Sequence, residues 1–187
     1  MPRLPLLSET LHDGPVRLRD ASSRDIPEVL IAYEDDPEMH QRLFEERPPS
    51  GAALGRRAES DYADRAAGSR ATLTVLADGS DRCVGQLSVH DLDWEHARGE
   101  LSLWIAPGAR RRGLGSASLR LACAWLFDRC ALARLQVLVE PDNVAMLRTA
   151  ARAGFRDEGI LRSHLRRRGV RLDVAVLSRL AADQEGE

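Results

Sequence analysis

Hydrophobic and polar positions alternate with a period of two in several short segments, as they do in half-buried β-strands. Asp78-Gly79-Ser80-Asp81 joins two of these segments and has the composition of a tight turn, so we expect an antiparallel hairpin there. The predicted strands are Val16–Arg19, Ala71–Ala77, Cys83–Asp91, Glu100–Ile105, Leu135–Val139, Phe155–His164 and Arg171–Leu177.

Several segments between these strands have the periodicity of helices. Apolar residues recur at three- and four-residue steps from Gly113 to Cys130, which predicts an amphipathic helix that packs on the sheet. A second helix should begin near Asp25, and a third should span Asn143–Ala153 and end at Gly154. Two short helices separated by a loop are expected between residues 35 and 68, the second in the Ala-, Arg- and Glu-rich segment Ala52–Ala67. This order of elements predicts an α/β (α+β) domain with a mixed sheet.

Composition and charge fit one domain and exclude some partners. The chain has 187 residues, of which 43 % are hydrophobic and 4 % aromatic, and its formal net charge is -2. No overall field would attract nucleic acid or an anionic membrane, and aromatic platforms for bases are scarce. Positive charge is concentrated locally, at Arg110–Arg112 and between Arg162 and Arg171, where it forms either anion sites or solvated faces.

The cysteines and histidines suggest no metal site. Cys83, Cys123 and Cys130 are odd in number and too widely spaced for a CxxC motif, so we expect neither a disulfide framework nor a metal centre. No apolar run approaches the roughly 18 residues that span a bilayer, and no signal-peptide pattern is visible. The cytoplasm is therefore the expected compartment.

One strand-to-helix junction has the features of a phosphate site. In the segment from Ile105 to Ser116, Gly113 and Gly115 allow close approach of a ligand to the backbone, and Arg110–Arg112 add charge. The unpaired N–H groups at the start of the helix would hold a pyrophosphate. The segment lacks the Lys-Ser/Thr of a P-loop and the third glycine of a dinucleotide fingerprint.

The same segment resembles the coenzyme A motif of the Gcn5-related N-acetyltransferases, in which Arg or Gln is followed after two residues by Gly-x-Gly/Ala. Arg110, Gly113 and Gly115 fit this motif in register. The strand before the loop, and the later Val139–Asn143 and Ala153–Phe155, are also similar to the family, so the resemblance covers roughly residues 98–165. The residues in these segments are most similar to those of the subgroup of ribosomal-protein N-terminal acetyltransferases.

The resemblance implies a fold and a set of binding residues. The fold is a mostly antiparallel sheet with helices on both faces and splayed central strands, in a domain of residues 14–182 preceded by an arm of residues 1–13. Acetyl-coenzyme A is the implied co-substrate, with its pantetheine arm on the backbone at Ile105 and on the Asn143 amide, although Asn143 is also a good helix N-cap. The implied binding residues are Trp104, Ile105, Arg110, Arg111, Arg112, Gly113, Leu114, Gly115, Ser116 and Asn143.

The implied reaction is acetyl transfer to a primary amine by direct attack in a ternary complex, which requires a base. Glu100 is the candidate general base; the alternative is that it lies in solvent at a strand edge, or pairs with Arg98, and contributes little. Many relatives carry a proton-donating Tyr where this chain has Ala150, and the subgroup often has Ser at the position of Met146. The alternative function is therefore a non-catalytic acyl-coenzyme A-binding regulatory domain.

The sequence does not identify the amine that accepts the acetyl group: a protein N-terminus and a small-molecule amine both fit. Carboxylates in two regions could attract its ammonium group, or could belong to polar surface turns. We expect a monomer or a homodimer, because the apolar final strand could pair across a dimer or complete the sheet. The candidate acceptor-side residues are Asp35, Asp36, Glu38, His90, Asp91, Asp93, Trp94, Glu95 and His96.

Overall fold

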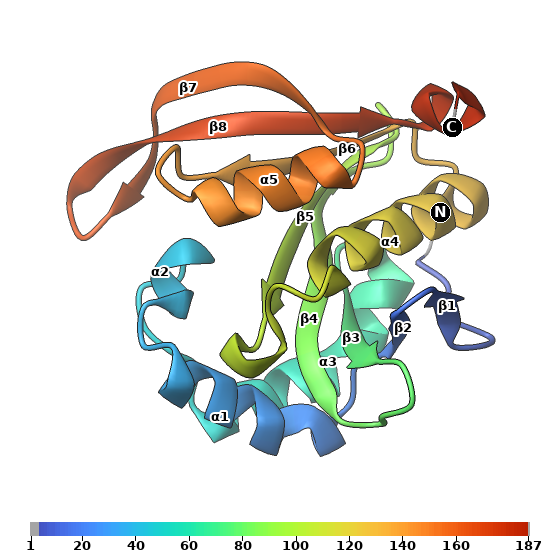
Figure 1. The fold of residues 1–187 in the computed structure, drawn as a ribbon, viewed down its shortest axis with the longest axis vertical. Coiled ribbons are helices and arrows are strands. Elements are labelled where there is room, and N and C mark those ends of the chain that lie inside the picture. Colours follow the sequence, from blue (N-terminus) through green and yellow to red (C-terminus); the bar gives the residue numbers. More distant parts are fainter. Residues whose placement is uncertain (1–3, 187) are drawn as a thin grey trace.

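The computed structural model describes residues 4–186, which form one eight-stranded sheet in the order β1-β2-β3-β4-β5-β6-β8-β7 (Figure 1). Only the β5–β6 pair is parallel, which confirms the predicted mixed, mostly antiparallel sheet. The strands are β1 Leu11–Asp13, β2 Val16–Asp20, β3 Ala71–Ala77, β4 Cys83–Asp93, β5 Arg98–Ile105, β6 Arg134–Val139, β7 Arg156–Arg167 and β8 Val170–Leu180. The helices are α1 Ile26–Asp35, α2 Met39–Arg42, α3 Gly51–Ala67, α4 Leu114–Cys130 and α5 Val144–Arg152.

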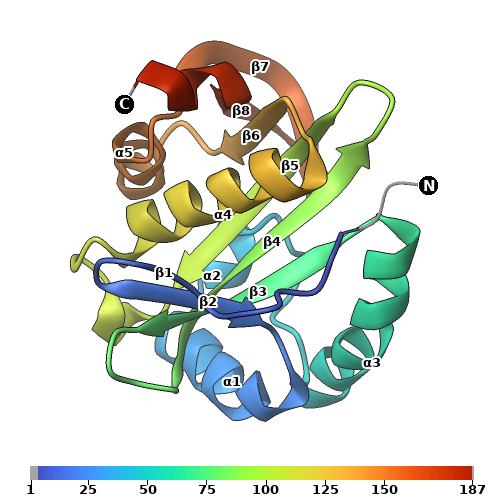
Figure 2. The ribbon, with the colours of Figure 1, turned by 90° about the vertical axis from the view of Figure 1, so that its right-hand side faces the viewer.

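The two faces of the sheet bury different side chains, because successive residues of a strand point to opposite faces. Leu73, Leu87 and Leu101 pack with α4 in the main core. On the other face, Trp104 packs with Val29 and Tyr33 of α1 in a second apolar cluster. Figure 2 shows α4 crossing the strands while α1 and α3 lie apart from it. None of the helices within residues 4–186 has the length and apolar character needed to cross a membrane.

The predicted strands and the β3–β4 hairpin are confirmed, with small shifts at their ends. The two helices and the intervening loop expected between residues 35 and 68 are also present. The first, α2, has four residues, and the second, α3, has 17, is capped by the Ser50 hydroxyl and ends at Gly68 with φ 70°. The final strand, β8, lies between β6 and β7 and so completes the sheet.

Residues 4–13 were expected to form an arm outside the domain, but they pack on it. Leu11–Asp13 adds an edge strand to β2, and the Leu4 side chain is only 2 % exposed in the main core. No sequence pattern predicted this packing, because the segment is short and contains proline and no sustained alternation.

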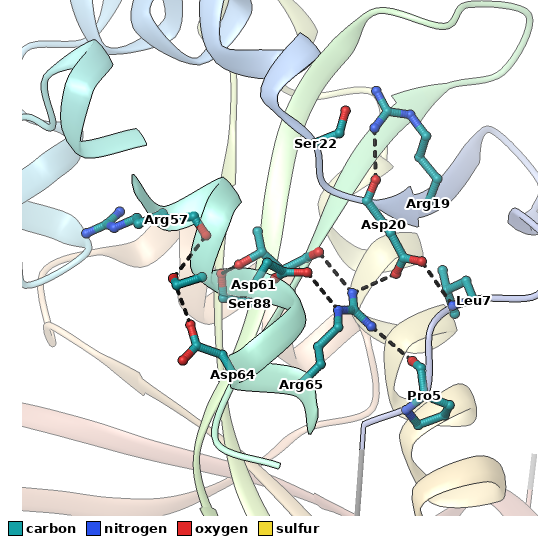
Figure 3. A network of polar contacts seen from close by, with 12 residues as sticks. Pro5, Leu7, Arg19, Asp20, Ser22, Arg57, Asp61, Asp64, Arg65 and Ser88 are labelled. Carbon is teal, nitrogen blue, oxygen red and sulfur yellow. Dashed lines mark hydrogen bonds and ion pairs between the residues drawn. The ribbon is translucent and has the colours of Figure 1, made fainter. Parts of the chain in front are cut away.

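A buried guanidinium fastens this segment to the domain (Figure 3). Arg65 of α3 is 2 % exposed and donates to Asp61 at 2.9 Å, to Asp20 at 2.6 Å and to the carbonyl of Pro5 at 2.9 Å. Asp20 in turn accepts the Leu7 N–H at 3.0 Å. A buried charge is tolerated when its donors are paired in this way.

Replacement of Arg65 by leucine should therefore destabilise the fold. Asp20 and Asp61 would be left half-buried without a counter-charge, and we expect the free energy of unfolding to fall by about 2 kcal/mol, less than for fully buried pairs because both carboxylates keep some solvent. Urea unfolding measures the change. Arg56→Leu, at an exposed position of the same helix, is the control and should change stability by less than about 0.5 kcal/mol. An equal effect of both substitutions would contradict the role of Arg65.

Candidate active site

A large cleft lies between the sheet and the α1–α3 region. Its volume is about 1740 Å³, and it extends from the amino-terminal end of α4 along β5 to His90 and Glu100. Single small ligands occupy pockets of about 300–1,000 Å³, so this cleft has room for two substrates or for one long one.

The cleft opens where the two central strands separate. β5 pairs with β6 only from Arg98 to Glu100, although β5 continues to Ile105 and β6 to Val139. The Ala106 N–H donates to the Val84 carbonyl of β4. Successive residues of a strand direct their backbone N–H and C=O groups to opposite sides, so every second residue of β5, starting with the one before Ala106, directs these groups into the gap. An extended ligand could pair with this unpaired edge as an added strand would.

The phosphate-type junction has the expected geometry. Gly113 is the N-cap of α4 with φ 77°, in the left-handed region that favours glycine, and a Cβ there would meet nothing within 4 Å. Gly115 differs, because its Cβ would lie 3.0 Å from Cγ2 of Thr149. One glycine therefore shapes the loop, and the other allows α5 to approach. The N–H groups at the start of α4 face the cleft without acceptors inside the helix.

The predicted arginines of the loop have different environments. Arg110 donates from Nε to the Ile105 carbonyl at 2.8 Å and pairs with Asp36, so it ties the loop to the end of α1. Arg111 lines the cleft, and Arg112 is not among the residues that line it. Two arginines that the sequence interpretation did not select, Arg148 and Arg152, line it from α5. Their spacing of four residues on one helix was the available signal.

The remaining predicted binding residues lie around the same cleft. Asn143 caps α5 by accepting the Met146 N–H at 3.2 Å, which leaves its amide NH₂ free to contact a ligand. Leu114 is buried at the start of α4, and Ser116 donates to the Gly113 carbonyl at 3.1 Å. The indole of Trp104 packs 6.3 Å from the ring of Tyr33, so its side chain supports the α1 side of the cleft.

Polar side chains form the floor of the cleft in cross-strand rows. Thr72, Ser88 and Ser102 lie opposite one another on β3, β4 and β5. In the next row, His90 lies opposite Glu100, and both line the cleft; Gln136 of β6, which pairs with Glu100, is not among the lining residues. The alternation that suggested a solvent-exposed strand face thus places polar groups inside a cleft, because α1–α3 cover that face.

Glu100 is at the centre of this second row. Its carboxylate accepts from the Gln136 amide at 3.3 Å. Burial raises the pKa of Glu100, an effect that the Gln136 hydrogen bond and the nearby His90 partly oppose. His164 of β7, which the sequence interpretation missed, also lines the cleft and acts on this carboxylate. A half-buried carboxyl with a raised pKa is better suited to accept a proton than one in water.

His90, Asp91 and Glu100 could hold a metal ion, since their donor atoms lie within 4.8 Å of one another. The cluster was not foreseen, because the sequence places Glu100 nine residues from Asp91 and shows no ligand spacing. Two of its members already interact: His90 Nδ1 lies 2.7 Å from an Asp91 oxygen. Asp91 has φ 48° at a register shift of β4, where a β-bulge redirects its side chain.

The positions expected to lack a proton donor differ in their surroundings. Ala150 is fully buried in the main core, away from the residues that line the cleft, whereas Met146 lines it. Tyr33 supplies a hydroxyl, but it donates to Glu45 at 2.9 Å, and burial raises its pKa.

The proposed acceptor-side residues divide into two groups. Asp36, Glu38, His90 and Asp91 line the cleft. Asp93 instead pairs with His96 and Arg98 in a turn, and the Trp94 indole donates to the Gly68 carbonyl at 2.7 Å. Asp35, Trp94, Glu95 and His96 are not among the lining residues.

Ion pairs connect the two sides of the cleft beside α2. Arg42 donates to Asp142 at 2.7 Å and to Glu140 at 3.3 Å, and Arg167 pairs with Glu140 and donates to the Gln41 carbonyl at 3.0 Å. Arg42 and Asp142 are 100 positions apart in the chain. In Figure 1, α2 accordingly lies below the turn that joins β6 to α5.

The amino-acid sequence matches one family of proteins. A family model described as an acetyltransferase (GNAT) domain matches residues 16–156, which is most of the chain. The chain therefore belongs to the GNAT acetyltransferase family.

Relatives and solved structures agree with this assignment. The chain is 30 % identical over 113 residues to "Putative ribosomal N-acetyltransferase YdaF" of Bacillus subtilis (strain 168), a match that spans 60 % of this chain and 61 % of that protein. It is 24 % identical to "Uncharacterized N-acetyltransferase p20" of Bacillus licheniformis, over 95 % of this chain and 99 % of the relative. The structure of Mycobacterium smegmatis RimJ in complex with CoA-disulfide superposes with a TM-score of 0.81 at 21 % identity, over 95 % and 90 % of the two chains.

Proposed function

We propose that this protein transfers an acetyl group from acetyl-coenzyme A to a primary amine in a ternary complex. The observation that carries the proposal is the arrangement of one continuous cleft: the amino-terminal end of α4 lies at one end, the unpaired edge of β5 runs along it, and Glu100 lies at the other end. A long donor with a phosphate group at one end and a thioester at the other fits this order.

In this proposal the pyrophosphate binds the first N–H groups of α4, with Arg111, Arg148 and Arg152 contributing positive charge. The pantetheine arm runs along β5 and contacts the Asn143 amide. Because the Ile105 carbonyl already accepts from Arg110, the free backbone groups of β5 lie nearer to Leu101 and Leu103.

Glu100 would act as the general base. It takes a proton from the acceptor ammonium, directly or through water, and the neutral amine attacks the acetyl carbonyl carbon. The carbon–sulfur bond breaks, the thiolate leaves, and a proton from water neutralises it. Neither Ala150 nor Met146 has a proton to donate. His90 and His164 lower the pKa of Glu100, and Asp91 raises it.

The names of several relatives suggest the class of acceptor. RimL, described as a ribosomal alpha-N-protein acetyltransferase in complex with coenzyme A, superposes with a TM-score of 0.79 at 17 % identity. A protein N-terminus is therefore our first candidate acceptor, ahead of a small-molecule amine.

A donor-binding domain without catalysis is the second candidate, and the buried Ala150 favours it. Thiol release from acetyl-coenzyme A, followed with a panel of N-terminal peptides, polyamines and amino acids, separates the two functions. Acetylation of a peptide N-terminus with matching thiol release supports transfer. Binding of acetyl-coenzyme A without transfer to any amine would favour the regulatory domain.

A further inference from the structure

Arg70 is a half-buried guanidinium at the acceptor end of the cleft that lacks a partner. Within residues 4–186 it makes no hydrogen bond and no ion pair. Its neighbours are paired: Arg57 with Glu45 at 3.1 Å, and Arg65 with Asp61 at 2.9 Å. Burial and the charge of Arg57 lower the pKa of Arg70, but a guanidinium stays charged at neutral pH.

The sheet register places Arg70 in the row that contains Glu100. Arg70 directly precedes Ala71, which pairs with Val89, so the next position opposite it on β4 is His90. His90 in turn lies opposite Glu100. Adjacent strands are about 4.8 Å apart, so the backbones of Arg70 and Glu100 are about 10 Å apart across the floor of the cleft. Because the Arg70 side chain is long, its guanidinium can lie closer to Glu100 than the two backbones do.

The groups around Arg70 suit an anion. The hydroxyls of Thr72 and Ser88, 3.1 Å apart, lie in the adjacent row and can donate. Three carboxylates act on the charge of Arg70: Glu45, Asp64 and Asp61. None pairs with it, because Glu45 and Asp61 are engaged by Arg57 and Arg65, and Asp64 accepts from the Ser60 hydroxyl at 3.0 Å. An unpaired, partly desolvated guanidinium beside two hydroxyls favours a planar carboxylate that accepts two parallel hydrogen bonds.

We propose that Arg70 binds a carboxylate of the acceptor, so that preferred acceptors carry a primary amine and a carboxylate within about 10 Å of each other, a span set by two strand spacings. The inference rests on the proposed acetyl transfer, in which the amine lies at Glu100. The carboxylate could come from an acidic side chain near a peptide N-terminus or from a free amino acid.

Matched acceptor pairs test the proposal. The first pair is a Ser-Asp-Ala-Ala amide peptide and its Ser-Asn counterpart; the second is 4-aminobutyrate and its amide. The parent should acetylate the acidic member of at least one pair with a kcat/KM at least about tenfold higher, as expected for a charge-assisted hydrogen bond, and the responding pair identifies the source of the carboxylate. Arg70→Gln should abolish the preference, Arg70→Lys should retain part of it, and the exposed Arg56→Gln should leave it unchanged.

The outcomes separate this inference from the proposed function. Equal rates within both pairs for the parent would overturn the role of Arg70, while still supporting acetyl transfer. An equal loss for acidic and neutral acceptors in Arg70→Gln would also overturn it. No transfer to any acceptor would refute the proposed function itself. The parent comparison needs no variant, so the test survives if Arg70→Gln folds poorly.

Discussion

Replacement of Gly113 by aspartate should weaken acetyl-coenzyme A binding at least about 100-fold, because it affects several charge-assisted hydrogen bonds at once. The new carboxylate would lie at the N-cap of α4, where it can accept the N–H groups that the pyrophosphate needs and repel the phosphate charge. Isothermal calorimetry of the parent and the variant measures the loss directly.

Gly79→Asp is the matched control for this experiment. Gly79 has φ 74° in the β3–β4 turn, nearly the same as the 77° of Gly113, and a Cβ at either position meets nothing within 4 Å. Both substitutions therefore carry a similar backbone strain, of order 1 kcal/mol. Only Gly113 lines the cleft, so Gly79→Asp should keep the parent affinity. Unchanged affinity in a folded Gly113→Asp protein would disprove the donor site.

Glu100→Gln should lower kcat by about 100-fold to 1,000-fold, the range that general-base catalysis contributes, and should leave acetyl-coenzyme A binding unchanged. The amide keeps the size of the side chain and can still interact with Gln136, but it cannot accept a proton from the amine. Steady-state acetylation measures kcat, and calorimetry serves as the control for donor binding.

The pH dependence gives this prediction a second readout. Burial raises the pKa of Glu100, so the base is protonated at low pH, and kcat/KM of the parent should rise with pH as this carboxyl ionises. The same raised pKa means that the contribution of Glu100 to stability is present at low pH and is lost as the pH rises through its folded-state pKa. Glu100→Gln should therefore be at least as stable as the parent at neutral pH. A variant that retains the parent rate and the parent pH profile would show that Glu100 is not the base.

Strand periodicity proved a strong guide to the fold. The hairpin of β3 and β4, the strand β5 and the helix α4 all lie close to their predicted bounds, because each has a long alternating or amphipathic pattern that burial of one face enforces. The positions of residues 4–13 were not predicted. Their positions depend on the buried Arg65, whose partners at residues 5, 20 and 61 are far apart in the chain.

The two ends of the cleft differed in how far they could be predicted. The phosphate-type loop is a local motif, so its residues could be selected from neighbouring positions in the sequence. The end of the cleft at Glu100 is assembled from β3, β4, β5 and β7 across the sheet, and its members have no fixed sequence spacing. Arg70, Gln136 and His164 were missed for this reason, and Asp93 and His96 were selected although they pair with each other in a turn.

The sequence by itself determined the order of the elements, the glycine-shaped start of α4 and the position of Glu100 on a central strand, because these depend on local backbone preferences and on short-range periodicity. The tertiary structure decided which polar face is covered by α1–α3, where β5 and β6 separate, and which charges remain unpaired. Those outcomes depend on strand register and on ion pairs between distant segments, such as Arg42 with Asp142. Long-range contacts of this kind leave no periodic signal in the chain, and here they make a row of ordinary polar residues the floor of a cleft.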